Sequence, residues 1–130
     1  MNYKRLINEA KKAKKNSHAP YSKFHVGAAL MTTGGEVIPG CNIENSSFSL
    51  TICAERTALF RAISEGKRRF KAIAVVSDSG DFTPPCGACR QVLRDLAGNI
   101  DVVLSDRKGR TKVVELDELL PLPFNDKYLR

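Results

Sequence analysis

The amino-acid sequence predicts an α/β fold, a three-layer α/β/α sandwich in which helices cover a mixed five-stranded sheet. Segments with helical and strand patterns alternate along the 130 residues, without an internal repeat or a linker. A strand–helix–strand succession over residues 71–104 implies two parallel strands joined by a right-handed crossover. The composition, 42% hydrophobic and 27% charged, is typical of a globular protein, and the length predicts a single domain over residues 1–130.

The first half of the chain is expected to form a helix, a β-hairpin and a second helix. Apolar side chains recur at helical spacing over residues 2–15 and predict an amphipathic helix. Residues 26–32 and 36–42 flank a Gly-Gly pair and predict a hairpin, in which Pro39 indicates that the second strand lies at an edge or bulges. An apolar stripe over residues 53–66 predicts the second helix, with its terminal glycine as the cap.

The second half repeats the exchange of strands and helices. Residues 71–77 form a nearly continuous apolar run, as expected of a strand buried on both faces. A helical pattern over residues 86–97 ends at a Gly-Asn stop, and residues 100–104 form another apolar run. A weaker strand near residues 111–114 and a final helix at about residues 115–120 complete the predicted fold.

The net charge of +7, from 21 Lys and Arg against 14 Asp and Glu, raises the question of a nucleic-acid partner. Much of the excess lies in residues 4–15, where the solvated face of a surface helix explains it better. No aromatic stripe lies among these basic residues on which bases would stack. The sequence therefore predicts no nucleic-acid partner.

Hydropathy predicts no membrane partner, because no apolar run approaches the roughly 18 residues needed to span a bilayer. The charged N-terminal segment lacks the apolar stretch of a signal peptide, so we expect a cytoplasmic location. The four cysteines are enough for two disulfides, but in a reducing compartment clustered thiols more often bind metal or take part in chemistry.

Three cysteines have the spacing of a metal site. Cys53 begins the second predicted helix, and Cys86 and Cys89 form a C-x-x-C pair at the start of the third. The amide groups and dipole of a helix N-terminus lower the pKa of a thiol and favour the metal-binding thiolate. The three sulfurs suit one tetrahedral zinc ion whose fourth position stays open, as in catalytic zinc sites.

Two residues beside Cys53 fit the chemistry of such a site. Glu55 lies close enough to accept a proton from a zinc-bound water without being a ligand, so we predict that it is the general base. Three thiolates overcompensate the charge of the dication. A guanidinium from Arg56 that donates hydrogen bonds to the sulfurs would restore some of the acidity of the water.

Other sites also contain a C-x-x-C pair, namely redox centres and structural zinc sites. A redox centre leaves the third thiol unexplained, and the sequence has no Trp beside the motif. A structural zinc site needs a fourth ligand, for which the candidates are His18, His25 and Cys41. These are better interpreted as a turn residue, a strand-start residue and a small buried side chain.

The motifs together resemble those of the small cytidine deaminases in the cytidine/deoxycytidylate deaminase superfamily. C-A-E-R at 53–56 and P-C-G-A-C-R-Q at 85–91 match the zinc nucleobase deaminase signature. Four further segments agree in order and spacing, namely Y-S-K-F at 21–24, V-G-A-A-L at 26–30, G-C-N-I-E-N at 40–45 and E-L-L-P at 118–121. The resemblance covers nearly the whole chain and is highly specific.

The resemblance implies a cytidine deaminase-like fold and the zinc-dependent hydrolytic deamination of cytidine and 2′-deoxycytidine in pyrimidine salvage. Cys53, Cys86 and Cys89 would hold one zinc ion per subunit. Glu55 would move protons from water to the pyrimidine N3 and then to the departing amino group. Hydroxide would attack C4, and ammonia would leave.

The resemblance also implies contacts with the nucleoside. Asn42 and Glu44 would hold the ribose 3′-hydroxyl, the backbone of Ala54 would contact the base, and Phe24 would pack against it. The short three-cysteine chain resembles the homotetrameric branch of the family, in which Phe124 would stack on the base in a neighbouring subunit. From the residues alone, the apolar tail that contains Phe124 would equally well cover its own core.

The resemblance also assigns two residues to the charge of the thiolates, and it shows where this sequence differs from the family. Arg56 and Gln91 resemble groups that temper the negative charge of the thiolates. The family commonly has Tyr where this chain has Phe48, and loss of one neutral hydrogen bond to the substrate 5′ end would cost about 1 kcal/mol without abolishing activity. Ser46 and Ser47 stand where small apolar residues are frequent and would offer a compensating polar contact.

Three other functions remain to be distinguished. A deaminase of nucleoside antibiotics of the blasticidin S type shares the zinc signature, although Arg56 and the N-I-E-N stretch at 42–45 favour cytidine. A basic nucleic-acid-binding module with structural zinc would show salt-sensitive binding and no catalysis. An enzyme that edits a base within a polynucleotide is disfavoured, because an internal nucleotide has no free 3′-hydroxyl for Asn42 and Glu44.

Overall fold

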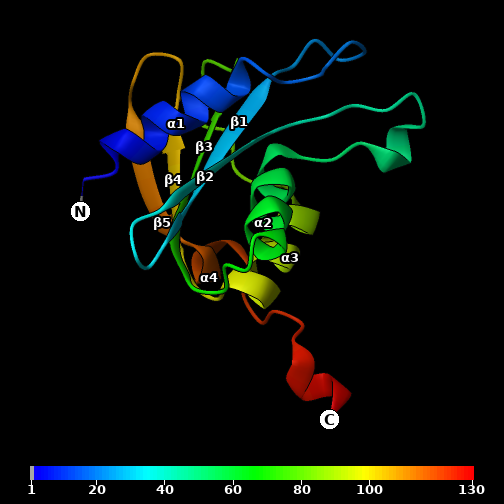
Figure 1. Ribbon diagram of the computed structural model, residues 1–130, viewed down its shortest axis with the longest axis vertical. Coiled ribbons are helices and arrows are strands. Elements are labelled where there is room, and N and C mark those ends of the chain that lie inside the picture. The colour runs from blue at the N-terminus through cyan, green and yellow to red at the C-terminus, as the bar shows by residue number, and fades with distance from the viewer. Residues whose placement is uncertain (1) are drawn as a thin grey trace.

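A mixed five-stranded sheet forms the middle layer of the computed structural model, which describes residues 2–130 (Figure 1). The strand order is β2-β1-β3-β4-β5, in which only β3 and β4 are parallel. The strands are β1 (Val26–Thr32), β2 (Val37–Cys41), β3 (Phe70–Ser77), β4 (Asp101–Ser105) and β5 (Thr111–Glu115). The predicted mixed sheet is confirmed, and Pro39 lies in the edge strand β2 as its missing N–H requires.

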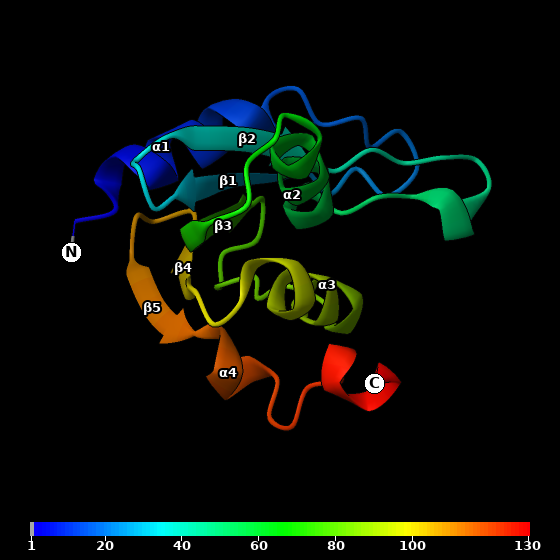
Figure 2. The ribbon, with the colours of Figure 1, turned by 60° about the horizontal axis from the view of Figure 1, so that its bottom comes forward.

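Helices cover both faces of this sheet and confirm the predicted three layers (Figure 2). On one face, α1 (Lys4–Lys14) buries Leu6, Ile7 and Ala10 against β1, β3 and β4. The opposite face carries α2 (Ala54–Ser64), α3 (Gly87–Ala97) and the short α4 (Leu116–Leu119). The buried stripes that the periodicity indicated are therefore the faces that pack on the sheet.

The candidate site residues gather at one end of the central strands because of the strand directions. β3 and β4 are parallel and joined through α3, as predicted, so the chain leaves the carboxyl end of β3 and enters α3 at this end. β1 runs antiparallel to β3, which sets Val26 opposite Ser77. The end of β2 lies there too, since Gly27 pairs with Cys41.

Two glycines allow helices to approach the sheet closely. A Cβ at Gly27 would lie 2.0 Å from the carbonyl oxygen of Ala10 in α1. A Cβ at Gly40 would lie 2.4 Å from the backbone nitrogen of Ala58 and 2.8 Å from the carbonyl oxygen of Ala54, both in α2. Both contacts are with helix backbone, so neither helix would keep its position over a larger residue.

The structure contains two features that the sequence patterns did not predict. Short 3-10 helices form at η1 (Phe48–Leu50) and η2 (Asp126–Leu129). The loop over residues 43–52, which contains η1, projects away from the sheet in both views (Figures 1 and 2).

Across residues 2–130, no helix combines the length and the apolar character that a membrane crossing requires.

The substitution Gly40→Ala is expected to lower the free energy of unfolding by about 2 kcal/mol, because the new methyl group overlaps the backbone of α2. Urea denaturation of the purified variant measures this loss. Gly34→Ala is the matched control, since its Cβ would meet only the Thr32 hydroxyl at 3.8 Å, and it should change stability by less than about 1 kcal/mol. Equal effects of the two substitutions would contradict the close approach of α2 to β2.

Candidate active site

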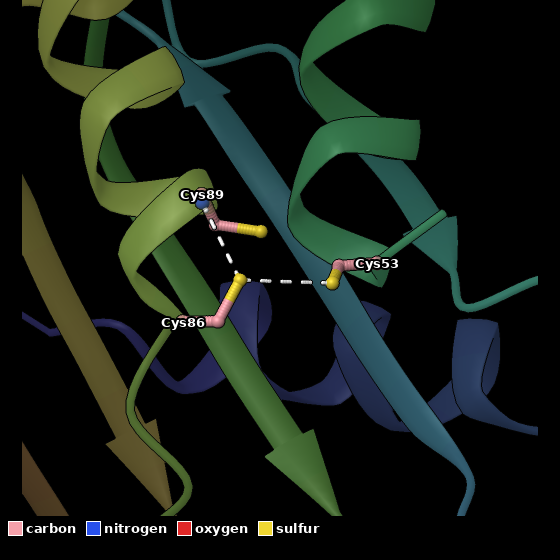
Figure 3. A group of neighbouring side chains, drawn as sticks. All are labelled: Cys53, Cys86 and Cys89. Atoms are coloured by element: carbon pink, nitrogen blue, oxygen red, sulfur yellow. Dashed lines mark hydrogen bonds between the residues drawn. The ribbon is translucent and has the colours of Figure 1, made fainter. Parts of the chain in front are cut away.

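Three cysteine sulfurs meet at the end of the central strands where α2 and α3 begin (Figure 3). The Sγ atoms of Cys53, Cys86 and Cys89 all lie within 4.8 Å of one another, and those of Cys53 and Cys86 are 3.8 Å apart. Figure 3 shows the three side chains pointing toward a common centre, one from the start of α2 and two from the start of α3. Residues that are 33 positions apart in the sequence thus form one cluster.

Local helix geometry places the sulfurs. Cys53 is the N-cap of α2 and Cys86 is the N-cap of α3, where the Sγ atom of Cys86 accepts a hydrogen bond of 3.4 Å from the backbone N–H of Cys89. The loop before α3 is held by Arg90, which donates to the carbonyl oxygens of Pro85 at 2.7 Å and Leu119 at 2.9 Å. Both helix dipoles therefore direct their positive ends at the thiol cluster.

Hydrogen bonds within the cluster favour the thiolate at Cys53 and the neutral thiol at Cys89. The pKa of Cys53 is lowered to about 5, because its thiolate accepts hydrogen bonds from the Cys89 thiol and from the guanidinium of Arg56. The Nη2–Sγ distance to Arg56 is 3.3 Å. The pKa of Cys89 is raised, since its thiol is the donor to Cys53 and is also buried. The cluster thus stabilises negative charge on sulfur beside a fixed cation.

The donor set fits a zinc ion. Zinc–thiolate bonds of about 2.3 Å place the sulfurs of a tetrahedral site roughly 3.8 Å apart, and the Cys53 and Cys86 sulfurs have this separation. The proposed structural-site ligands His18, His25 and Cys41 are outside the cluster, so residues 2–130 supply three donors and no fourth. This arrangement is that of a zinc site with an open coordination position.

Glu55 lies in the first turn of α2 and lines the same cavity as Cys53 and Cys86. Only 5% of its surface is exposed. Burial disfavours the charged carboxylate, and the negative charge of Cys53 adds to this effect, so the pKa of Glu55 is raised to about 7. A carboxyl group with a pKa near neutrality is suited both to accept and to release a proton.

The cavity has a volume of about 230 Å³ and is lined by further residues from the sequence analysis. Phe24, Asn42 and Ala54 contribute to its wall together with the two cysteines and Glu55. Glu44 lines an adjoining cavity of about 400 Å³ with Tyr21, Ser22 and Phe48, and Thr51 borders both. The candidate base and sugar contacts are therefore distributed over two hollows that share Thr51 in their walls.

Phe124 and Gln91 lie outside the cavity of their own chain, and the expected place of Phe124 is the pocket of a neighbouring subunit. Phe124 is 56% exposed and lines neither hollow, and its ring stacks on Tyr128 at a centroid distance of 5.4 Å. Gln91 donates from Nε2 to the carbonyl oxygen of Phe124 at 2.8 Å, so its amide reaches the C-terminal segment and not a cysteine sulfur. Gln91 therefore tethers residues 121–130 to α3.

The structure adds residues that the sequence patterns did not indicate. Thr51, Ile52 and Thr83 line the cavity, and the hydroxyl groups of Ser17 and Ser22 bond to Asn42 and Glu44. Ser22 belongs to the Y-S-K-F motif, and Thr51, Ile52 and Thr83 stand close to the cysteine motifs, but no pattern assigned any of them a role at the site. Their placement follows from contacts between distant segments.

Comparisons with known proteins agree with this geometry. A family model described as the cytidine and deoxycytidylate deaminase zinc-binding region matches residues 1–105. A cytidine deaminase of Sporosarcina psychrophila is 48% identical over 130 residues, covering 99% of this chain and 96% of that protein. A cytidine deaminase of Halalkalibacterium halodurans is 50% identical over 125 residues, covering 95% of each.

Two further matches concern the fold and the alternative substrate. The crystal structure of a cytidine deaminase from Burkholderia pseudomallei has a TM-score of 0.92 at 48% identity and covers 95% of this chain and 100% of that one. A blasticidin-S deaminase of Bacillus cereus is 36% identical over 111 residues, covering 79% of each. The matched region is a zinc-binding one, and the cysteine cluster lies within it. The chain therefore belongs to the cytidine and deoxycytidylate deaminase family.

Proposed function

We propose that this protein catalyses the hydrolytic deamination of cytidine and 2′-deoxycytidine to uridine and 2′-deoxyuridine, with release of ammonia. The observation that carries the proposal is the meeting of three cysteine sulfurs and a buried carboxyl group on one cavity. The relatives named cytidine deaminase, at 48% and 50% identity, support the choice of substrate. Clustered thiols stay reduced in the cytoplasm, where we place the reaction.

Cys53, Cys86 and Cys89 would hold the zinc ion, which when bound lowers the pKa of a water molecule and so supplies a nucleophile near neutral pH. The carboxylate of Glu55 accepts the water proton and passes it to N3 of the pyrimidine. After the water oxygen has bonded to C4, its second proton moves through the same carboxylate to the amino nitrogen, the C4–N bond breaks, and ammonia leaves. Burial and the raised pKa of Glu55 support this double role.

The remaining residues of the cavity bind and orient the nucleoside. Phe24 packs against the base, and the backbone of Ala54 contacts its polar edge. Asn42 and Glu44 hold the 3′-hydroxyl of the sugar, which selects a free nucleoside over a nucleotide inside a polymer. The Arg56 guanidinium offsets thiolate charge at Cys53, whereas the hydrogen bond of Gln91 supports a tethering role instead.

We propose a homotetramer in which each pocket is completed by neighbouring subunits, with Phe124 stacking on the base across the interface. Large apolar side chains are exposed on the single chain in the loop over residues 43–52 and in residues 121–130, including Phe48 at 72% and Leu129 at 78%. Burial of such surface favours association.

Light scattering after gel filtration should give a mass near four times that of one chain, and a monomer would contradict the assembly.

The other functions receive less support. The blasticidin-S deaminase relative is less similar and matches less of the chain than the cytidine deaminases above. A structural zinc site would need a fourth donor beside Cys53, Cys86 and Cys89, which residues 2–130 do not provide.

Ultraviolet absorbance of cytidine incubated with the purified, zinc-loaded protein tests the proposed reaction. We expect conversion to uridine, and faster turnover of cytidine than of blasticidin S under the same conditions. Absence of cytidine turnover by the zinc-loaded wild type would overturn the proposal.

Metal analysis tests the three zinc ligands. Wild-type protein should contain one zinc per chain, and Cys53→Ser, Cys86→Ser and Cys89→Ser should each lose most of it, because a serine oxygen is a poor replacement for thiolate. Cys41→Ser is the control, since this half-buried cysteine lies outside the cluster and its removal should leave zinc content unchanged. Stoichiometric zinc in any cluster variant would contradict its assignment.

The substitution Glu55→Gln should keep zinc bound but reduce kcat for cytidine at least about 100-fold, because an amide cannot carry the protons. Steady-state kinetics together with zinc analysis of the same preparation separate the two effects. Glu65→Gln, at the exposed C-terminal end of α2, should retain wild-type kcat. Turnover near the wild-type rate in Glu55→Gln would exclude this residue as the proton carrier.

A further inference from the structure

The side-chain amide of Asn42 has a fixed orientation. Its Oδ1 atom accepts hydrogen bonds from the backbone N–H of Val26 at 2.9 Å and from the hydroxyl of Ser17. Its Nδ2 atom donates to the carbonyl oxygen of Phe24 at 2.8 Å. Because a backbone N–H can only donate and a backbone carbonyl can only accept, these contacts define which end of the amide is oxygen.

The Asn42 amide has one hydrogen-bonding position left for a ligand. Both lone pairs of Oδ1 are used by Val26 and Ser17, and one of the two Nδ2 hydrogens is used by Phe24. The second Nδ2 hydrogen remains. Asn42 is buried and lines the cavity, so toward a ligand there it is a donor only.

Glu44 has the opposite polarity. Its Oε1 atom accepts from the backbone N–H groups of Tyr21 at 2.9 Å and Ser22 at 3.1 Å, and its Oε2 atom accepts from the Ser22 hydroxyl. The Ser22 hydroxyl is the largest cause of the lowered pKa of Glu44, so the group is an ionised carboxylate. With a remaining lone pair on Oε2, Glu44 is an acceptor only.

The backbone brings the two groups to one face. Ile43 lies between them and pairs with His18 on one side and with Ile52 on the other, so residues 42–44 are extended. In an extended segment, side chains two positions apart point to the same side. A donor that lines the first hollow and an acceptor that lines the second therefore point to the same side of this segment.

We propose that Ser17 and Ser22 are positioning residues that set Asn42 as donor and Glu44 as acceptor, so that together they select a sugar hydroxyl. A hydroxyl is the group that accepts from Asn42 and donates to Glu44 at the same time. The inference rests on the proposed nucleoside substrate and adds to it two residues that act through Asn42 and Glu44. Without the serine hydroxyl, each side chain keeps its backbone hydrogen bonds, but a second lone pair on Oδ1 of Asn42, or the Oε2 atom of Glu44, loses the contact that holds it.

Neighbouring contacts hold the two serines themselves. The hydroxyl hydrogen of Ser17 is given to Asn42, so the Nδ1 atom of His25, 3.1 Å from the Ser17 oxygen, is the donor in that contact. The Ser22 oxygen accepts from the backbone N–H of Phe24 at 3.0 Å. Lys23, which lies between Ser22 and Phe24, has a φ of 61°. This left-handed conformation is uncommon outside glycine and occurs where surrounding contacts enforce it.

Kinetics with a substrate that lacks the hydroxyl test the proposal. The variants are Ser17→Ala and Ser22→Ala, with the exposed Ser64→Ala at the end of α2 as control, and the substrates are cytidine and 3′-deoxycytidine. On cytidine, each test variant should lose about three- to tenfold in kcat/KM, mainly through KM, as expected for loss of one hydrogen bond. On 3′-deoxycytidine the same variants and Ser64→Ala should stay within about twofold of the wild type.

Binding of the products provides a readout that does not depend on turnover. Calorimetric titration should show the preference for uridine over 3′-deoxyuridine falling about three- to tenfold in Ser17→Ala and in Ser22→Ala. Equal losses with both sugars, or no loss in either variant, would overturn the proposal. Inactivity of the wild type on both nucleosides would instead overturn the proposed reaction, while the titration would still decide the role of the serines.

Discussion

The site depends on one constraint, that three thiol groups which repel one another as thiolates are held at a single point. Two helix N-termini meet this requirement, because Cys53 and Cys86 are the N-caps of α2 and α3 and Cys89 lies one turn into α3. Helix dipoles, the Cys89 amide and the Arg56 guanidinium all stabilise negative charge on the sulfurs. Cys53, Cys86 and Cys89 would hold a zinc ion, whose positive charge would complete this balance.

The sheet determines where this cluster forms. The parallel pair β3 and β4 with α3 as crossover places the C-x-x-C pair at the carboxyl end of β3, where ligand sites of α/β sheets commonly lie. The antiparallel β1 and β2 bring Val26 and Asn42 to the same end, and Gly40 lets α2 pack closely enough to add Cys53 and Glu55. Phe24, Asn42 and Glu55, the proposed base contact, sugar contact and proton carrier, thus come from different elements to line one cavity beside the cysteine cluster.

Local sequence patterns predicted the elements and the chemistry that a short segment contains. Helical spacing gave α1, α2 and α3 to within two or three residues, and the apolar runs gave β3 and β4. The motif C-A-E-R placed Glu55 and Arg56 beside Cys53, where the structure has them. The partners of Asn42 and Glu44 were not predictable in this way, because Ser17 and Ser22 reach them only after residue 18 has paired with residue 43. The bond from Gln91 to the carbonyl of Phe124 likewise depends on where the C-terminal segment folds.

Zinc K-edge X-ray absorption of the purified wild-type protein counts the ligand atoms of the metal and so shows whether the site has an open position. We expect three sulfur atoms at about 2.3 Å and one lighter atom at about 2.0 Å that exchanges with solvent. Four sulfur ligands, or three sulfurs with a histidine nitrogen, would show a closed structural site and exclude the proposed zinc-bound water.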